Sequence, residues 1–252
     1  MNLLAGTNPV ARIIGLMLMT TPLLISIDWV SAAVALAFTI VLSPLCGLGL
    51  GALARRAWPI LLAAPISGIS MLLYGEPGGR IYFEFWLATI SDNSISLAFA
   101  IMMRVLAVGL PVMVLTANTD PTDLGDGLAQ VLKLPAKFVI AAVAGVRLMT
   151  LFVNDWHALT RARRARGLGD DGKIRRLFSQ VFALLVFALR RSAKLSTAME
   201  ARGFGSSVER TWARESSFST RDWAVIAACV GIAILAIAVA VWTGQFRFLG
   251  VS

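Results

Sequence analysis

Five stretches of this chain are long and apolar enough to cross a lipid bilayer, or nearly so. They run over residues 13–27, 29–50, 59–74, 95–117 and 223–242. A transmembrane helix needs about 17 to 25 mostly apolar residues. Of all residues, 58% are hydrophobic and only 15% are charged, which excludes an ordinary soluble domain. We therefore predict an all-α integral membrane protein with about five transmembrane helices.

The first apolar stretch is short, and its flanks imitate a secretory signal. Arg12 precedes it, and the small residues Ser31-Ala32-Ala33 follow it. The second stretch starts almost at once after Asp28, however. We therefore expect an uncleaved, tight helical hairpin at the N-terminus.

Charge indicates the orientation, because positive residues favour the cytoplasmic side of a membrane. Arg55 and Arg56 lie between the second and third stretches, whereas residues 75–94 carry three acidic residues against Arg80 alone. The arginine loop is then cytoplasmic and the acidic loop external. This orientation places the N-terminus inside and the C-terminus outside.

A basic region separates the fourth apolar stretch from the fifth. Residues 154–222 hold fourteen Lys or Arg against seven acids, a net of +7 within a whole-chain charge of +9. Such charge determines topology and attracts anionic lipid headgroups. It is interleaved with apolar runs, so no nucleic acid partner is expected. We predict transmembrane helices in residues 1–118, a cytoplasmic helical region in residues 119–222, and a last transmembrane helix and tail in residues 223–252.

The cytoplasmic region starts with a strong helix signal. Asp120 suits the cap position, Pro121 suits the first helical position, and Asp123 suits the positive end of the helix. The helix should run to about residue 132 and stop near Pro135.

Two longer helices are expected after it, over residues 135–166 and 174–202. In the first, the apolar run 138–153 rises only about 24 Å and is interrupted by Arg147. In the second, the nine apolar residues 181–189 rise only about 13 Å. Neither run matches a hydrocarbon core of about 30 Å. We expect the first helix to lie at the membrane interface, and the second to face a partner or the membrane-embedded part with its apolar half and the cytosol with its basic half.

Both long helices end in the same tripeptide, Ala165-Arg166-Gly167 and Ala201-Arg202-Gly203, and each copy is followed by an apolar residue and a second glycine. Glycine can adopt the left-handed conformation that closes a helix, and arginine complements the negative end of the helix dipole. One such ending indicates only capping. Two copies indicate a shared role, in which an always-charged guanidinium at a rigid tip binds acidic groups or carbonyls of a partner.

Taken together, these motifs resemble the transmembrane T component of energy-coupling factor transporters, which import vitamins and transition-metal ions into prokaryotic cells. The similarity includes Asn8-Pro9, the run Thr119-Asp120-Pro121-Thr122-Asp123-Leu124, and both Ala-Arg-Gly copies. The resemblance implies a non-catalytic scaffold in the prokaryotic cell membrane, with long coupling helices on the cytoplasmic side.

The resemblance also implies partners and roles. Two ATP-binding-cassette ATPases would receive the two helix ends, which makes Ala165, Arg166, Gly167, Ala201, Arg202 and Gly203 the docking residues. The apolar faces of the coupling helices would hold a separate substrate-binding membrane subunit, the S component. Three further arginines, 161, 163 and 164, would be auxiliary. No cofactor, metal ligand or catalytic residue is implied.

Two arginines interrupt apolar runs, Arg104 in the fourth stretch and Arg147 in the first long cytoplasmic helix. A buried charge in a membrane needs a partner. The functional interpretation is a link that positions helices near Asp120 and Asp123. The alternative is that the side chains extend to the headgroups.

A different class of function is an integral-membrane prenyltransferase, in which Asp120, Asp123 and Asp126 would hold Mg²⁺ and a diphosphate. A second acidic motif is missing, which argues against it. His157 is the only histidine, so no His-Glu-x-x-His zinc site exists, and the chain has no phosphate-binding loop for ATP. A self-contained secondary transporter would favour internal repeats, which we do not find.

Overall fold

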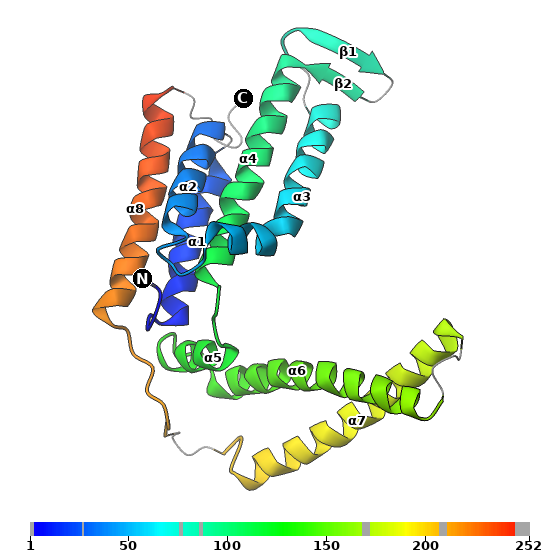
Figure 1. The fold of residues 1–252 in the computed structure, drawn as a ribbon. Coiled ribbons are helices and arrows are strands. Elements are labelled where there is room, and N and C mark those ends of the chain that lie inside the picture. Colours follow the sequence, from blue (N-terminus) through cyan, green and yellow to red (C-terminus); the bar gives the residue numbers. More distant parts are fainter. Residues whose placement is uncertain are drawn as a thin grey trace. The chain divides into compact units, whose positions relative to one another are not determined.

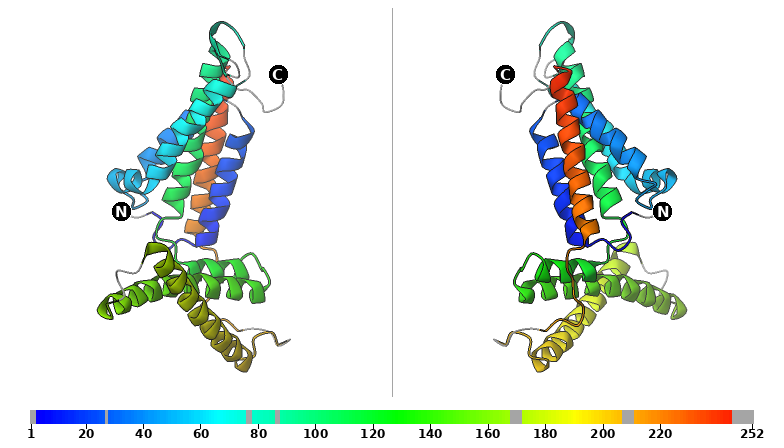
Figure 2. Two further views of the ribbon diagram at one scale, coloured as in Figure 1. Left: turned by 90° about the vertical axis from the view of Figure 1, so that its right-hand side faces the viewer. Right: turned by 90° about the vertical axis from the view of Figure 1, so that its left-hand side faces the viewer.

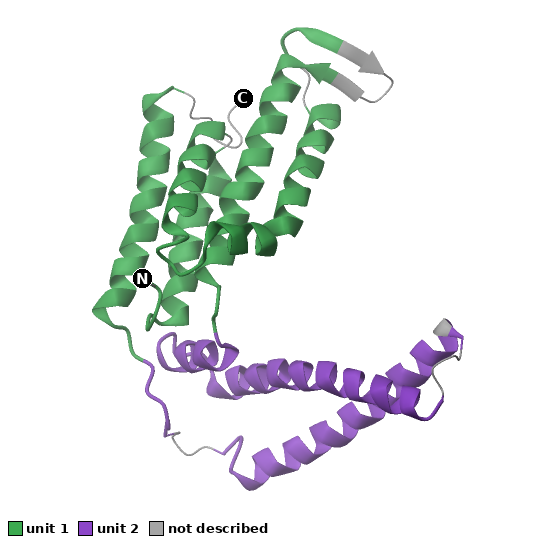
Figure 3. Cartoon of the chain, in the orientation of Figure 1, with its two compact units in different colours: residues 1–119, 217–252 green, residues 120–216 purple. Residues whose placement is uncertain are grey.

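The computed structural model describes residues 3–26, 28–75, 78–85, 88–167, 172–206 and 211–244. Within these residues the chain forms eight α-helices and one β-hairpin (Figure 1). They fall into two compact units, which are coloured separately in Figure 3. Unit 1 comprises residues 1–119 and 217–252, and unit 2 comprises residues 120–216. The chain thus leaves unit 1 once, forms unit 2, and returns.

Unit 1 is a bundle of five helices. Helices α1, α4 and α8 run side by side, α2 packs on α4 and α8, and α3 packs on α4 (Figure 2). The helices are α1 (Pro9–Ile25), α2 (Trp29–Leu42), α3 (Leu50–Tyr74), α4 (Asp92–Leu115) and α8 (Thr220–Trp242). All five expected apolar stretches are therefore helical, and the all-α class is confirmed.

The expected boundary of the third helix was wrong. Helix α3 begins at Leu50, so Arg55 and Arg56 lie in its first turns and not in a loop. Pro59 and Pro65 lie inside the helix. Membrane helices tolerate proline because neighbouring groups satisfy the freed carbonyls.

Helix α2 is shorter than its apolar stretch. It ends at Leu42, because Pro44 lacks an N–H donor and Gly47 turns the chain with a φ of 82°. With 14 residues in α2 and 17 in α1, these two helices are shorter than a typical span.

A β-hairpin interrupts the acidic loop, where the sequence analysis expected no regular structure. Strand β1 (Ile81–Phe85) pairs antiparallel with β2 (Ala88–Ser91), with Glu84 opposite Thr89. The strands carry β-branched and aromatic residues, which favour extended structure.

The helices of unit 1 approach each other closely through small residues. A Cβ added at Gly109 of α4 would lie 2.7 Å from Cγ2 of Ile60 on α3, and one added at Gly68 of α3 would overlap the side chain of Met102 on α4. Many of the buried residues are alanines, glycines and serines. Small residues let membrane helices pack backbone against backbone.

A buried polar cluster joins the start of α1 to the start of α8. Asp222 is only 1% exposed and accepts the backbone N–H of Asn8 at 2.5 Å. Arg12, 8% exposed, donates to Thr7 Oγ1 at 2.8 Å and interacts electrostatically with Asp222. The sequence analysis read Arg12 only as a flanking charge.

Among the described helices, four are long and apolar enough to cross a membrane: α3, α4, α8 and, in unit 2, α6 (Ala136–Ala165). In α6 the most apolar 18-residue window has a mean hydropathy of 1.9. Length and composition thus allow α6 to span a bilayer, and its interfacial placement stays a prediction.

Candidate functional site

Unit 2 contains the three helices expected from the sequence. They are α5 (Pro121–Gln130), α6 (Ala136–Ala165) and α7 (Lys173–Ala201), each within two residues of the expected bounds. The predicted cap of α5 is confirmed, because Asp120 Oδ1 accepts the backbone N–H of Thr122 at 2.7 Å. That bond lowers the pKa of Asp120 below its ordinary value, and the nearby charges of Arg214 and Arg147 act in the same direction.

Helices α6 and α7 cross each other (Figure 2). Three polar side-chain pairs bind the C-terminal half of α6 to α7 at the crossing, with donor–acceptor distances of 2.8, 3.4 and 2.9 Å. The pairs are Asp155–Arg191, Thr160–Gln180 and Arg163–Ser179.

This antiparallel crossing separates the two helix ends. From Gln180 to Arg202 helix α7 rises about 33 Å, and from Thr160 to Arg166 helix α6 rises about 9 Å. The two C-terminal ends lie on opposite sides of the crossing (Figure 1). Unit 2 therefore presents its two arginine tips as separate points.

Each tip is a helix closed by a left-handed glycine, as the sequence predicts. Gly167 has a φ of 74° and Gly203 a φ of 76°. At the second tip, Gly203 N–H donates to Glu200 O and Phe204 N–H donates to Met199 O, both at 2.9 Å, which is a Schellman motif.

The same turn fixes the arginines as the last residues of their helices. Arg166 and Arg202 are the C-cap residues, and both are exposed. A residue with a Cβ in place of either glycine would cost about 1–2 kcal/mol. Each guanidinium is thus held at the end of a rigid rod and is accessible to a partner.

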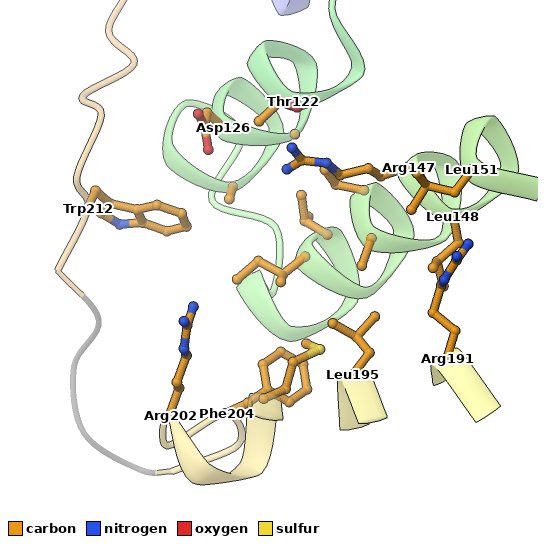
Figure 4. A pocket seen from close by; sticks show the side chains of 17 residues that line it. Thr122, Asp126, Arg147, Leu148, Leu151, Arg191, Leu195, Arg202, Phe204 and Trp212 are labelled. Atoms are coloured by element: carbon orange, nitrogen blue, oxygen red, sulfur yellow. The ribbon is translucent and has the colours of Figure 1, made fainter. Parts of the chain in front are cut away.

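A groove of 610 Å³ lies between α5, the N-terminal half of α6 and the C-terminal part of α7 (Figure 4). Apolar side chains from α6 and α7 form its walls, including Leu148, Leu151 and Leu195. Arg147 and Arg202 contribute positive charge to it. Arg202, at the tip of α7, therefore also borders an apolar groove within unit 2.

Apolar side chains are also exposed along α6 and α7. Phe138 of α6 is 77% exposed, and Phe178 and Phe182 of α7 are 72% and 68% exposed. Along α7 these positions recur at helical spacing, and they form one face with Ile174, Leu177, Val181, Leu185 and Leu189. A continuous apolar face of this size indicates contact with a partner or with lipid.

The two arginines within apolar runs have different environments. Arg147 is exposed, and its charge contributes to the lowered pKa of Asp120, while its role as a link that positions helices stays a prediction. Arg104 is 8% exposed, and the acid that interacts with it in unit 1 is Asp28, at the cap of α2. Because Asp28 is distant in sequence, the residue pattern alone did not reveal this electrostatic interaction.

The three carboxylates that would hold Mg²⁺ in a prenyltransferase lie in three different environments. Asp120 caps α5, Asp123 Oδ1 lies 2.9 Å from Arg214 Nη1, and Asp126 borders the groove. In the part of the chain that the structure describes, no three acidic, histidine or cysteine residues gather as a metal site. The geometry gives the prenyltransferase interpretation no support.

The sequence analysis did not identify the residues that hold the segment after α7. Gln130 lies more than 80 positions before Trp212 and Arg214, and the structure brings these residues together in unit 2.

The fold and these surfaces define a multi-pass α-helical membrane protein whose second unit carries exposed apolar faces and two arginine-tipped helices. The sequence profile of CbiQ, described as a cobalt transport protein, matches residues 2–212. The chain belongs to this family, the T components of energy-coupling factor transporters. It is a membrane component of a bacterial transporter.

Curated relatives agree with this assignment, and all three cited here are named energy-coupling factor transporter transmembrane protein EcfT. The protein of Brevibacillus brevis is 25% identical over 93% of this chain and 92% of its own length. That of Limosilactobacillus fermentum is 27% identical over 70% of each chain. That of Lactobacillus helveticus is 30% identical over 60% of this chain and 58% of its own.

Proposed function

We propose that this chain is the coupling scaffold of an energy-coupling factor importer and carries out no covalent chemistry itself. Two ATP-binding-cassette ATPases would bind the helix ends at Arg166 and Arg202. A separate substrate-binding membrane subunit, which takes up a vitamin or a transition-metal ion, would pack on the exposed apolar faces of α6 and α7. The family membership supports this role.

The feature that supports ATPase docking most directly is the pair of arginines at rigid, left-handed glycine turns. A guanidinium offers five donors in a fixed planar arrangement, so it can bind a carboxylate or two carbonyl groups in a groove. Because the left-handed glycine ends each helix, the helix cannot continue past the arginine. Each arginine is therefore held at a defined position at its helix end.

The crossing of α6 and α7 explains why two docking points are useful. ATP binding that closes the ATPase pair would move both tips. A helix held at one tip could pivot, whereas two crossed helices held at both tips transmit a displacement. The polar pairs at the crossing, including Arg191–Asp155 at 2.8 Å, hold the two helices together. The displacement would reorient the substrate-binding subunit in the membrane.

The test is affinity purification of the tagged chain from membranes of its own host, with mass spectrometry to quantify ATP-binding-cassette subunits. Arg166→Glu and Arg202→Glu should each reduce the recovered ATPase at least tenfold, because charge reversal repels an acidic or carbonyl-lined groove. Arg175→Glu, an exposed charge reversal at the start of α7, serves as the control and should change recovery little. Full ATPase recovery with both tip variants would disprove docking at the tips.

A further inference from the structure

The side chain of Gln130 on α5 makes two hydrogen bonds to the connection from α7 back to α8. We call residues 211–219 the strap; it has no helix or strand. Gln130, the last residue of α5, donates from Nε2 to the carbonyl of Arg214 at 2.8 Å. Its Oε1 accepts the backbone N–H of Ser216, also at 2.8 Å. Both functional atoms of one amide thus bind the strap backbone.

Other contacts within unit 2 hold the same connection. Arg214 Nη1 lies 2.9 Å from Asp123 Oδ1 on α5. Just after the α7 tip, the carbonyl of Gly205 accepts a hydrogen bond from Lys137 Nζ at 3.0 Å. Trp212 of the strap borders the groove between α5, α6 and α7 (Figure 4). The segment that follows Arg202 is therefore attached to the α5–α6 corner at both of its ends.

The strap continues into α8 with little slack. Ser216, bound to Gln130, is three residues from Ser219, the N-cap of α8, and three extended residues reach only about 10 Å. Ser219 N–H donates to Asp222 Oδ2 at 2.6 Å, and Asp222 also binds the backbone of Asn8. Between these two attachments the chain therefore has only three residues with which to extend.

We infer that Gln130 is a positioning residue for coupling, which fixes the strap so that motion of the Arg202 tip reaches α5 and α8. This inference rests on the proposed function. Without the two amide bonds, the strap backbone would gain conformational freedom that absorbs part of the displacement of the tip. With them, the tip, the α5–α6 corner and the start of α8 form one tethered series.

The first experiment needs no partner. Hydrogen exchange of the Ser216 amide, measured on the full chain in lipid nanodiscs, should be about tenfold faster in Gln130→Leu, as expected when two neutral hydrogen bonds are lost. Gln130→Glu keeps the acceptor for Ser216 and loses the donor to Arg214, so its exchange should be intermediate. Gln180→Leu makes the same change at the α6–α7 crossing and should leave the strap unaffected. Equal exchange in Gln130→Leu and the parent would overturn the inference.

The second experiment measures transmission. Nitroxide labels at Ser196→Cys on α7 and Thr220→Cys on α8, in a Cys46→Ala, Cys229→Ala background, report their distance by pulsed EPR in the ATPase-bound complex. ATP should shift this distance in the parent, and Gln130→Leu should reduce the shift at least twofold with the amount of bound ATPase unchanged. The same shift in both would also overturn the inference. If no ATPase binds the parent, the proposed docking fails, and hydrogen exchange still decides whether Gln130 fixes the strap.

Discussion

The helices of unit 1 bury charged groups in a common core, whereas the two long helices of unit 2 bury few residues of any kind. In unit 1, Asp222 is 1% exposed and Arg104 8% exposed. In unit 2, Phe138 and Phe178 are more than 70% exposed, and the buried residue found in the described part of α7 is the polar Gln180. Unit 1 therefore has a core of its own, although apolar side chains on its outer faces, such as Met17 at 62% and Trp242 at 89%, are also exposed. The long helices α6 and α7 of unit 2 bury few residues, so most of their surface is exposed.

This contrast predicts where single substitutions act on stability. The largest loss should come from Asp222→Ala, because it removes the acceptor of two backbone N–H groups and leaves Arg12 buried without its acidic partner. We expect a loss of about 3–5 kcal/mol. Chemical unfolding in nanodiscs measures it, with Asp123→Ala as the control, since the Asp123–Arg214 pair is exposed. Equal losses for the two variants would remove the distinction between the units.

The next largest effect concerns helix packing. Gly109→Val should destabilise unit 1 by about 1–3 kcal/mol, because even a Cβ at this position meets Ile60 of α3. Gly145→Val is the matched control in α6, where a Cβ would have no neighbour within 4 Å. The control should be neutral or slightly stabilising, because valine is a better helix former than glycine. A destabilised control would show that α6 is packed against something within the chain.

A smaller effect is expected at the α6–α7 crossing. The Asp155–Arg191 pair is partly exposed, with side-chain exposures of 26% and 37%. A double-mutant cycle with Asp155→Ala and Arg191→Ala should give a coupling free energy of about 0.2–1 kcal/mol. A coupling free energy above 2 kcal/mol would mean that this pair contributes to stability as strongly as a buried pair in the core of unit 1.

The smallest effect on stability should come from the exposed apolar face. Phe182→Ser should change the unfolding free energy by no more than about 0.5 kcal/mol, because the side chain is 68% exposed. The same variant should reduce co-purification of the substrate-binding subunit, while Thr197→Ala, a polar position on α7, should not. If Phe182→Ser lost much stability but still co-purified with the substrate-binding subunit, Phe182 would belong to the packing within the chain and not to a partner surface.

Local signals in the sequence were sufficient for the helices of unit 2 and their ends. The cap at Asp120 and the left-handed glycines at Gly167 and Gly203 are set by neighbouring residues, so the helix ends could be predicted. The apolar segments of unit 1 were also predictable, because each is a continuous run.

Features that depend on distant residues could not be predicted in the same way. The interaction of Arg104 with Asp28 and the attachment of Gln130 to Ser216 join residues more than 70 positions apart. The start of α3 was missed because a membrane helix can contain Pro59 and Pro65. The docking roles of Arg166 and Arg202 rest on the family resemblance and on the exposed tips, and they stay a prediction.

The closed end of α7 also has a consequence for rotation. An α-helix turns by about 100° and advances about 1.5 Å with each residue. One residue inserted between Leu189 and Arg202 would leave every backbone hydrogen bond of the helix intact, yet it would point the guanidinium about 100° away from its present direction relative to Phe178. Because Gly203 stops the helix at a fixed residue, the sequence sets the angle between the tip and the apolar face. Under the proposed function, the ATPase and the membrane subunit that bind α7 would have to match this angle.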